Sequence, residues 1–191
     1  MAEITTDILI SCADENRRAG IKRVFVINKD DITSFTADTV AGSHAYTAVT
    51  LAATDDVWFE IEGELESKGY SSEGSVENGS VSYEGSLEVF VPKMEKLKAY
   101  GLNEYVQSCK LVVIFETYNK VGTENSAFVF GYDEIMGTDA SVRAIANEVL
   151  EATLQGQNGY TATFAGKGAE LLREYVGAIV TNTSGTVNFG A

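Results

Sequence analysis

The sequence predicts a mainly β protein, an antiparallel β-sandwich or barrel-like core with one α-helix at its flank. Short segments that alternate apolar and polar residues, rich in β-branched and aromatic side chains, recur along most of the chain. The clearest segment, YSSEGSVENGSVSYEGSLEVFV over residues 70–91, carries Asn78-Gly79 at its centre, a strong short signal for a hairpin. With 191 residues and 45% hydrophobic composition, the chain is expected to form one domain with a substantial core.

Further strands are expected on both sides of this hairpin. Segment 20–36, GIKRVFVINKDDITSFT, predicts a strand over 22–28, an Asp-Asp turn and an extended piece over 32–36. The continuous apolar run in CKLVVIFETY, 109–118, predicts a strand that is covered on both faces. Other strands are expected in HAYTAVTLA, VWFEIEGELESKGY, SAFVFGYDEI and NGYTATFAG. The side chains expected to build the core are Val24, Val26, Trp58, Phe59, Ile61, Val112, Ile114, Phe128, Phe130, Tyr160 and Phe164.

One helix is expected at about 91–101, because Pro92 suits the first helical position and Gly101 suits the residue that ends a helix. One or two further turns over 102–107 stay open as an alternative. A second helix over about 140–154 is favoured by the helical spacing of its apolar residues, with Asp139 as a suitable N-cap. The ends of the chain, residues 1–19 and 177–191, are interpreted as arms.

The hairpin has two unlike faces. A two-residue loop at Asn78-Gly79 pairs Glu77 with Ser80 and Glu73 with Glu84, and side chains then alternate between the faces. One face is apolar, with Tyr70, Val76, Val81, Tyr83, Leu87 and Val89. The other holds Ser71, Glu73, Ser75, Glu77, Ser80, Ser82, Glu84, Ser86 and Glu88. It must stay hydrated, because no Lys or Arg between Gly69 and Val91 can pair with its carboxylates. The plain interpretation is a solvated sheet face.

The charge of the chain restricts its partners. The chain has 28 Asp and Glu but only 14 Lys and Arg, which gives a net charge of −14. This charge disfavours attraction to a nucleic-acid backbone or to an anionic membrane surface. The start of the chain lacks a basic region before its short apolar run, and no apolar stretch approaches the length of a bilayer span. Cys12 and Cys109 are expected to be reduced, buried thiols.

No catalytic, cofactor-binding or metal site is expected, and no cofactor. His44 is the single histidine, and the chain has no GxSxG or GxxxxGK[ST] pattern. The carboxylates in NKDD, 28–31, and TDD, 54–56, do not match the twelve-residue calcium loop and are typical of turns. A small hydrolase with paired acids stays open as an alternative, and it predicts a cleft with a strongly shifted carboxylate pKa.

The order of these segments resembles that of a bacteriophage tail tube protein, most similar to those of phages that infect Bacteroidetes-type hosts. The resemblance rests on the succession GIKRVFVINKDDITSFT, ENGSVSYEGSLEVFVPKM, LVVIFETYN, AFVFGYDEIMG and QNGYTATFAG, and no one of these motifs is diagnostic alone. It covers about Gly20 to Gly166 and leaves the residues after Val176 unmatched.

The resemblance implies a non-enzymatic virion protein, assembled in the host cytoplasm, that forms hexameric rings stacked into a hollow tail tube. In that family the inner sheets of six subunits join into one β-barrel, and a long loop or hairpin reaches the next ring. DNA passes through the lumen at ejection without specific binding. Other tail proteins are implied as partners at the ends of the tube, and no membrane contact is implied. The family also implies extended structure over 139–154, where propensity favours a helix.

On this interpretation Glu73, Glu77, Glu84 and Glu88 are expected to face the lumen, because an acidic wall repels a polyanion weakly and leaves no binding sites. The main alternative is a non-enzymatic β-sandwich that binds carbohydrate or serves as a host-adhesion or capsid-decoration module. A tube protein should form rings or polymers at high concentration, whereas a binding module should stay monomeric or trimeric.

Overall fold

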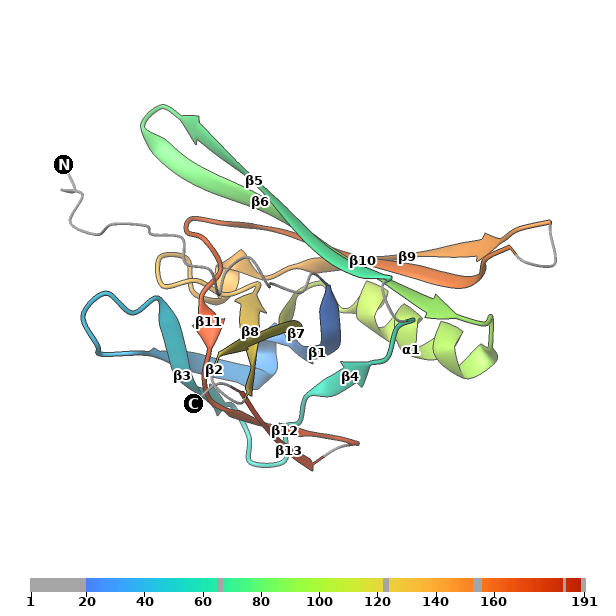
Figure 1. Ribbon diagram of the computed structural model, residues 1–191, viewed down its shortest axis with the longest axis horizontal. Helices are drawn as coiled ribbons and strands as arrows, with labels where there is room; N and C mark the ends of the chain where they lie inside the picture. The colour runs from blue at the N-terminus through green and yellow to red at the C-terminus, as the bar shows by residue number, and fades with distance from the viewer. Residues whose placement is uncertain (1–19, 65–66, 122–123, 153–155, 184, 190–191) are drawn as a thin grey trace.

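A computed structural model describes residues 20–64, 67–121, 124–152, 156–183 and 185–189. The fold is mainly β with one α-helix in the described residues, which confirms the predicted fold class. A seven-stranded sheet forms the central layer, a four-stranded sheet packs on one of its faces, and a two-stranded hairpin covers the other (Figure 1).

The central sheet has the strand order β2-β3-β11-β8-β7-β1-β4. Its strands are β1 (Ile21–Asn28), β2 (Ile32–Ala37), β3 (Ala45–Leu51), β4 (Phe59–Ile61), β7 (Leu111–Val121), β8 (Glu124–Phe130) and β11 (Glu174–Tyr175). All neighbours run antiparallel except β11 and β3, which are parallel. A short 3-10 turn, η2 (Lys29–Asp31), joins β1 to β2, where an Asp-Asp turn was predicted.

Strand β7 is buried on both faces, as its continuous apolar run predicts. Every side chain from Leu111 to Phe115 is 3% exposed or less. Val113 and Phe115 lie in the cluster shared with the four-stranded sheet, whereas Val112 and Ile114 lie in the cluster on the opposite face. The alternation of strand side chains therefore supplies two apolar layers from one strand.

The four-stranded sheet has the order β5-β6-β10-β9 and runs across the top of Figure 1. Its strands are β5 (Lys68–Glu77), β6 (Ser80–Pro92), β9 (Arg143–Leu150) and β10 (Asn158–Gly168). The hairpin β5–β6 has the predicted register, with Glu77 opposite Ser80 and Glu73 opposite Glu84. Asn78 and Gly79 both adopt positive φ, +50° and +81°, as a type I′ turn requires.

The helix favoured over 140–154 is wrong, because residues 143–150 form strand β9, paired antiparallel with β10. Pairing with β10 supplies the backbone hydrogen bonds, and tertiary context overrides helix propensity. As a strand, this segment directs Ala144 into the core and leaves Ile145 56% exposed. In the described part of residues 138–152, the helical structure is the 3-10 turn η3 (Thr138–Ala140).

The flanking helix exists, but its predicted bounds, about 91–101, are wrong. Helix α1 covers Lys96–Gln107, and Pro92 is the last residue of β6, opposite Gly159. Gly101 lies inside the helix instead of ending it. The apolar face of β6 continues to Val91, which packs in the core. The strand therefore extends to Pro92, the residue that was expected to start the helix. Leu102 anchors α1 beneath β9 and β10 (Figure 1).

Near the C-terminal end, β12 (Ala178–Thr181) and β13 (Gly185–Asn188) form the hairpin that covers the central sheet. Ile179, Val187 and Phe189 are buried there, and the Phe189 ring meets Phe25 edge-on with centroids 5.8 Å apart. These residues fall in the segment interpreted as a C-terminal arm. The proposed N-terminal arm, residues 1–19, lies outside the described residues.

Most of the predicted core residues are buried. The exceptions are Phe128, which is partly buried, and Phe59, which is 43% exposed. Trp58 is buried on the side of the central sheet that the β12–β13 hairpin covers, and alternation points Phe59 to the other side, together with buried Ile61. Phe59 stays exposed there at the start of the edge strand β4. The expectation of a buried thiol is wrong for Cys109, which is exposed, and Cys12 lies outside the described residues.

We expect Trp58→Ala to lower the free energy of unfolding by about 3–5 kcal/mol, because the side chain is fully buried and its loss leaves a large cavity. Trp58→Phe should cost far less, since it keeps an aromatic ring and removes an indole N–H that has no hydrogen-bond partner among the described residues. Urea denaturation measures both. A loss below about 1 kcal/mol for Trp58→Ala would contradict the core position of this residue.

Candidate functional site

The candidate site is the face of the four-stranded sheet that points away from the core, which we call the polar face. On β5 and β6 it consists of Ser71, Glu73, Ser75, Glu77, Ser80, Ser82, Glu84, Ser86 and Glu88. The register continues this face across β10 and β9 with Thr161, Thr163, Ala165, Lys167, Arg143, Ile145 and Asn147. The polar face is therefore rich in hydroxyls on β5, β6 and β10, acidic on β5–β6 and weakly basic toward β9.

The four glutamates predicted as site residues lie together on the polar face and are all exposed. Glu73 and Glu84 are direct cross-strand neighbours. Glu84 forms an exposed ion pair with Lys167 of β10, and this hydrogen bond raises the pKa of Lys167. For Glu73, Glu77 and Glu88, the described part of the chain supplies no ion pair.

The sequence-based prediction considered cations only within the hairpin and did not include Lys167 as a partner of Glu84. No local signal links Lys167 to Glu84, since 83 residues separate them. The link comes from the register of β10 with β6, which places the two residues opposite each other.

On the polar face, the described side chains that contact one another are Ser75 with Ser82 and Glu84 with Lys167. The hydroxyl contact joins Ser75 and Ser82 across the strands, with 3.0 Å between the oxygens. Near β9 the face dips into a depression of about 480 Å³, lined by Glu84, Lys110, Asp139, Arg143, Lys167 and smaller residues. The face is chemically a hydrated surface of hydroxyls and charges on a rigid sheet.

The tip of the β5–β6 hairpin extends beyond the core at the upper left of Figure 1. On its apolar side, Leu87 and Val89 are buried against the core, but Val76 is 71% and Val81 46% exposed. Among the described residues, the apolar core therefore covers only the half of the hairpin that is farther from its turn. The other half presents an apolar pair on one side and carboxylates on the other.

Strand β5 is a long edge. Among the described strands it pairs only with β6, and it contains no proline over its ten residues. A two-residue turn makes Glu77 and Ser80 a hydrogen-bonded pair, so the backbone groups of alternate residues such as Ser72 and Gly74 point away from β6. Such an edge is a template for pairing with another strand.

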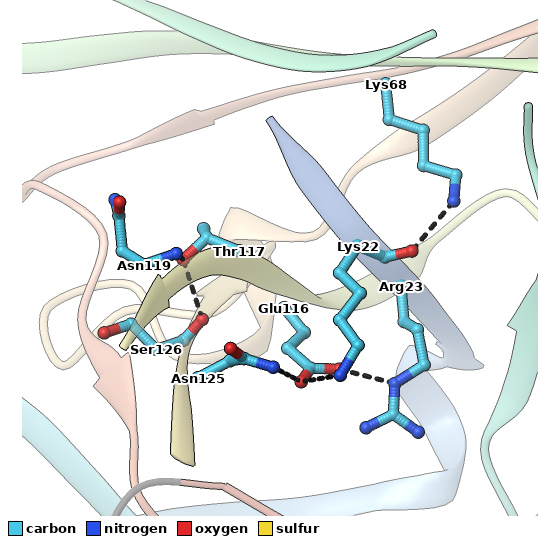
Figure 2. A network of polar contacts seen from close by, with 8 residues as sticks. All are labelled: Lys22, Arg23, Lys68, Glu116, Thr117, Asn119, Asn125 and Ser126. Atoms are coloured by element: carbon cyan, nitrogen blue, oxygen red, sulfur yellow. Dashed lines mark hydrogen bonds and ion pairs between the residues drawn. The ribbon is translucent and has the colours of Figure 1, made fainter. Parts of the chain in front are cut away.

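A second polar cluster surrounds Glu116 of β7 (Figure 2). Its carboxylate accepts hydrogen bonds from Lys22 Nζ at 3.1 Å, Arg23 Nε at 2.5 Å and Asn125 Nδ2 at 2.6 Å. Burial alone raises the pKa of Glu116, but the bonds from Arg23, Asn125 and Lys22 outweigh it and hold the pKa below the ordinary value of 4.5. With these donors in place, Glu116 ties β1, β7 and β8 together, which is a structural role.

The two acidic turns noted in the sequence come close together in space. Burial raises the pKa of the Asp31 carboxyl, and the nearby charge of Asp56 adds to this effect. Asp56 accepts a hydrogen bond from the backbone N–H of Ala53 at 2.7 Å, as turn residues commonly do. Within the described ranges, no group of three or more His, Cys, Asp or Glu is placed to hold a metal ion.

His44 lies in an exposed loop, with its Nε2 3.0 Å from the carbonyl oxygen of Leu171. No helix in the described part of the chain is long and apolar enough to cross a membrane.

Comparison of the chain with protein-family models, curated proteins and solved structures gave no match.

We expect Glu116→Gln to destabilise the protein by about 1–3 kcal/mol at neutral pH, because Lys22 and Arg23 would lose their carboxylate partner. The lowered pKa of Glu116 means that its stabilisation is present above about pH 4.5 and is lost as the pH falls through the folded-state pKa. The free energies of unfolding of wild type and variant should therefore converge below pH 4.5 in urea titrations.

Glu73→Gln serves as the matched control, since Glu73 is exposed and makes no ion pair with a described residue. A difference between wild type and Glu116→Gln that stays constant down to acidic pH would contradict the role assigned to this carboxylate.

Proposed function

We propose that this chain is a structural subunit that assembles into rings and stacks them into a tube, as the tail tube protein of a bacteriophage. One observation carries the proposal: the four-stranded sheet has one face buried by its own core, one hydrated polar face, and two edge strands that pair with no further strand among the described residues. Such a sheet is suited to continue from one copy into the next.

The two edges are β5 and β9, at opposite sides of the sheet. Pairing β5 of one copy with β9 of the next is a head-to-tail contact, which generates a closed ring when the rotation between copies closes. The polar face of β5 carries Glu73 and Glu77, whereas that of β9 carries Arg143. Joining the sheets would bring these opposite charges near each other across the junction.

The polar face would line the inside of the ring. The other face of the sheet is already packed against the seven-stranded sheet, so the bulk of each subunit must lie outside the closed barrel. The lumen wall would then consist of Ser and Thr hydroxyls, the four glutamates and a few cations. Duplex DNA carries about one negative charge per 1.7 Å, and such a wall offers it little to bind.

The further details come with the family resemblance. They are hexameric rings, a place in the virion tail after assembly in the host cytoplasm, other tail proteins at the tube ends and the absence of enzymatic activity. The net charge of −14 on each subunit makes assembly dependent on shared sheet and apolar contact, and we expect it to be favoured by salt.

The proposal is tested by electron microscopy and sedimentation velocity of the purified protein at rising concentration. Rings or tubes support it. A protein that stays monomeric or trimeric at every concentration and ionic strength would contradict it and favour the adhesion or decoration module.

We expect Ser72→Pro to abolish ring formation while leaving the subunit folded. The N–H of Ser72 points away from β6, so proline removes a donor from the outer edge without breaking the β5–β6 ladder. Ser72→Ala is the matched control, because it removes the hydroxyl and keeps the N–H. Circular dichroism reports folding, and sedimentation reports assembly; unchanged rings in Ser72→Pro would exclude β5 as the joining edge.

We expect tubes of the double variant Glu73→Lys/Glu84→Lys to retain short duplex DNA that wild-type tubes do not, because lysines would place phosphate-binding groups in the lumen. Glu73→Gln/Glu84→Gln is the control that removes the acids without adding cations. Retention should fall steeply with added salt. Equal DNA retention by lysine, glutamine and wild-type tubes would remove the lumen assignment of this face.

A further inference from the structure

The depression beside β9 holds more positive than negative charge, in a chain whose net charge is −14. Its charged lining residues are Glu84, Lys110, Asp139, Arg143 and Lys167. Both acids already have a cation, because Glu84 pairs with Lys167 and Asp139 accepts from Lys29 Nζ at 3.0 Å. Lys110 and Arg143 form no ion pair with any described residue. Two positive charges in this basic depression are therefore left without a counter-charge from the described chain.

The fold holds these two cations beside each other. Leu111 and Val142 form an antiparallel bridge, in which each backbone N–H donates to the carbonyl of the other, at 2.9 and 2.8 Å. In such a bridge the residue before one partner lies beside the residue after the other, so Lys110 lies beside Arg143. Leu111 and Val142 are buried, and alternation leaves both cations exposed on the opposite side. Like charges side by side are unfavourable, and an anion between them would offset this cost.

The third cation reaches the same space from β10. Arg143 pairs with Ala165, and Lys167 lies two residues farther along β10, on the same face. Between the long side chains, the lining consists of short residues such as Ala165, Gly166 and Gly85, which leave the depression open. Its volume of about 480 Å³ lies within the range of roughly 300–1,000 Å³ that small-molecule sites occupy.

We propose that the basic depression binds a small molecule that carries linked phosphate groups, held by Lys110, Arg143 and Lys167. The planar guanidinium of Arg143 can donate two parallel hydrogen bonds to one phosphate, and the lysines add point charges. The Ser141 hydroxyl, which also lines the depression, supplies a further donor. The exposed Lys167–Glu84 pair is weak enough to let Lys167 turn toward the ligand.

The surroundings of the depression favour a small anion over a nucleic acid. The rest of the polar face carries Glu73, Glu77 and Glu88, which have no ion pair with a described residue. A long duplex lying over the depression would meet these carboxylates, whereas a small ligand stays clear of them.

Binding is tested by isothermal titration calorimetry of the full chain with sodium pyrophosphate, at a protein concentration below assembly and at constant ionic strength. One saturable site per chain is expected. Lys110→Gln and Arg143→Gln should each weaken binding by about tenfold or more, because each removes a charge-assisted hydrogen bond. Arg143→Lys should weaken it less, since it keeps the charge and loses the fork. Lys96→Gln removes one unpaired, exposed charge from α1 and should leave binding unchanged.

Cys109 provides a second measurement, because its exposed thiol lines the same depression. In a Cys12→Ser background it is the one thiol of the chain. Pyrophosphate should slow its reaction with the neutral reagent N-ethylmaleimide, over the same concentrations that release heat. The protection should be lost in Arg143→Gln, and sodium chloride at equal ionic strength should give none.

Several results would overturn the proposal. They are no saturable binding, binding that is unchanged in both glutamine variants, and an equal loss in Lys96→Gln. Sodium succinate, which carries two carboxylates, should bind more weakly than pyrophosphate, and equal binding would exclude phosphate as the preferred group. A short DNA duplex that protects Cys109 where pyrophosphate does not would assign the depression to a nucleic-acid backbone instead. These measurements use unassembled protein, so their outcome is independent of whether rings form.

Discussion

The structure depends on one constraint: the central sheet has two apolar faces, and both must be kept from water. The stretch Leu111–Phe115 of β7 sends side chains to both sides and is buried throughout. Each fully buried large side chain contributes about 1.5–3 kcal/mol of hydrophobic stabilisation, so a single cover would leave half of this contribution unrealised. The four-stranded sheet provides one cover and the β12–β13 hairpin the other.

The polar face follows from that arrangement. Strands β6 and β10 give their apolar sides, with Leu87 and Phe164 fully buried, to the core. Alternation then leaves their other sides in water, and residues of the hydroxyl and carboxylate types satisfy this requirement without burial cost. The strand pair β5–β6 is longer than the core that it covers, so its tip and its outer edge remain as surfaces without a partner among the described residues. These leftover surfaces are what an assembling protein can use.

Carboxylates have different partners in the interior of the subunit and on the polar face. In the interior, the carboxylate of Glu116 is matched by three donors, and Glu170 is matched by Arg173 in a largely buried pair at 2.9 Å. On the polar face, glutamates stand beside one another, and only Glu84 has a cation from the described chain. Buried acids thus stabilise the subunit, whereas the exposed acids lower its stability slightly and shape how it meets other molecules.

Features that depend on neighbouring residues follow from the sequence. Asn78-Gly79 dictates a turn with positive φ at both positions, and the turn dictates the register of the hairpin and the composition of its faces. The apolar run of β7 dictated burial on two sides. The remaining features depend on pairing between segments that are distant in the sequence, so no local pattern predicts them. The helical spacing over 143–150 gave way to the ladder with β10, Pro92 ended a strand instead of starting a helix, and Lys167 reached Glu84 through a register that no local pattern encodes.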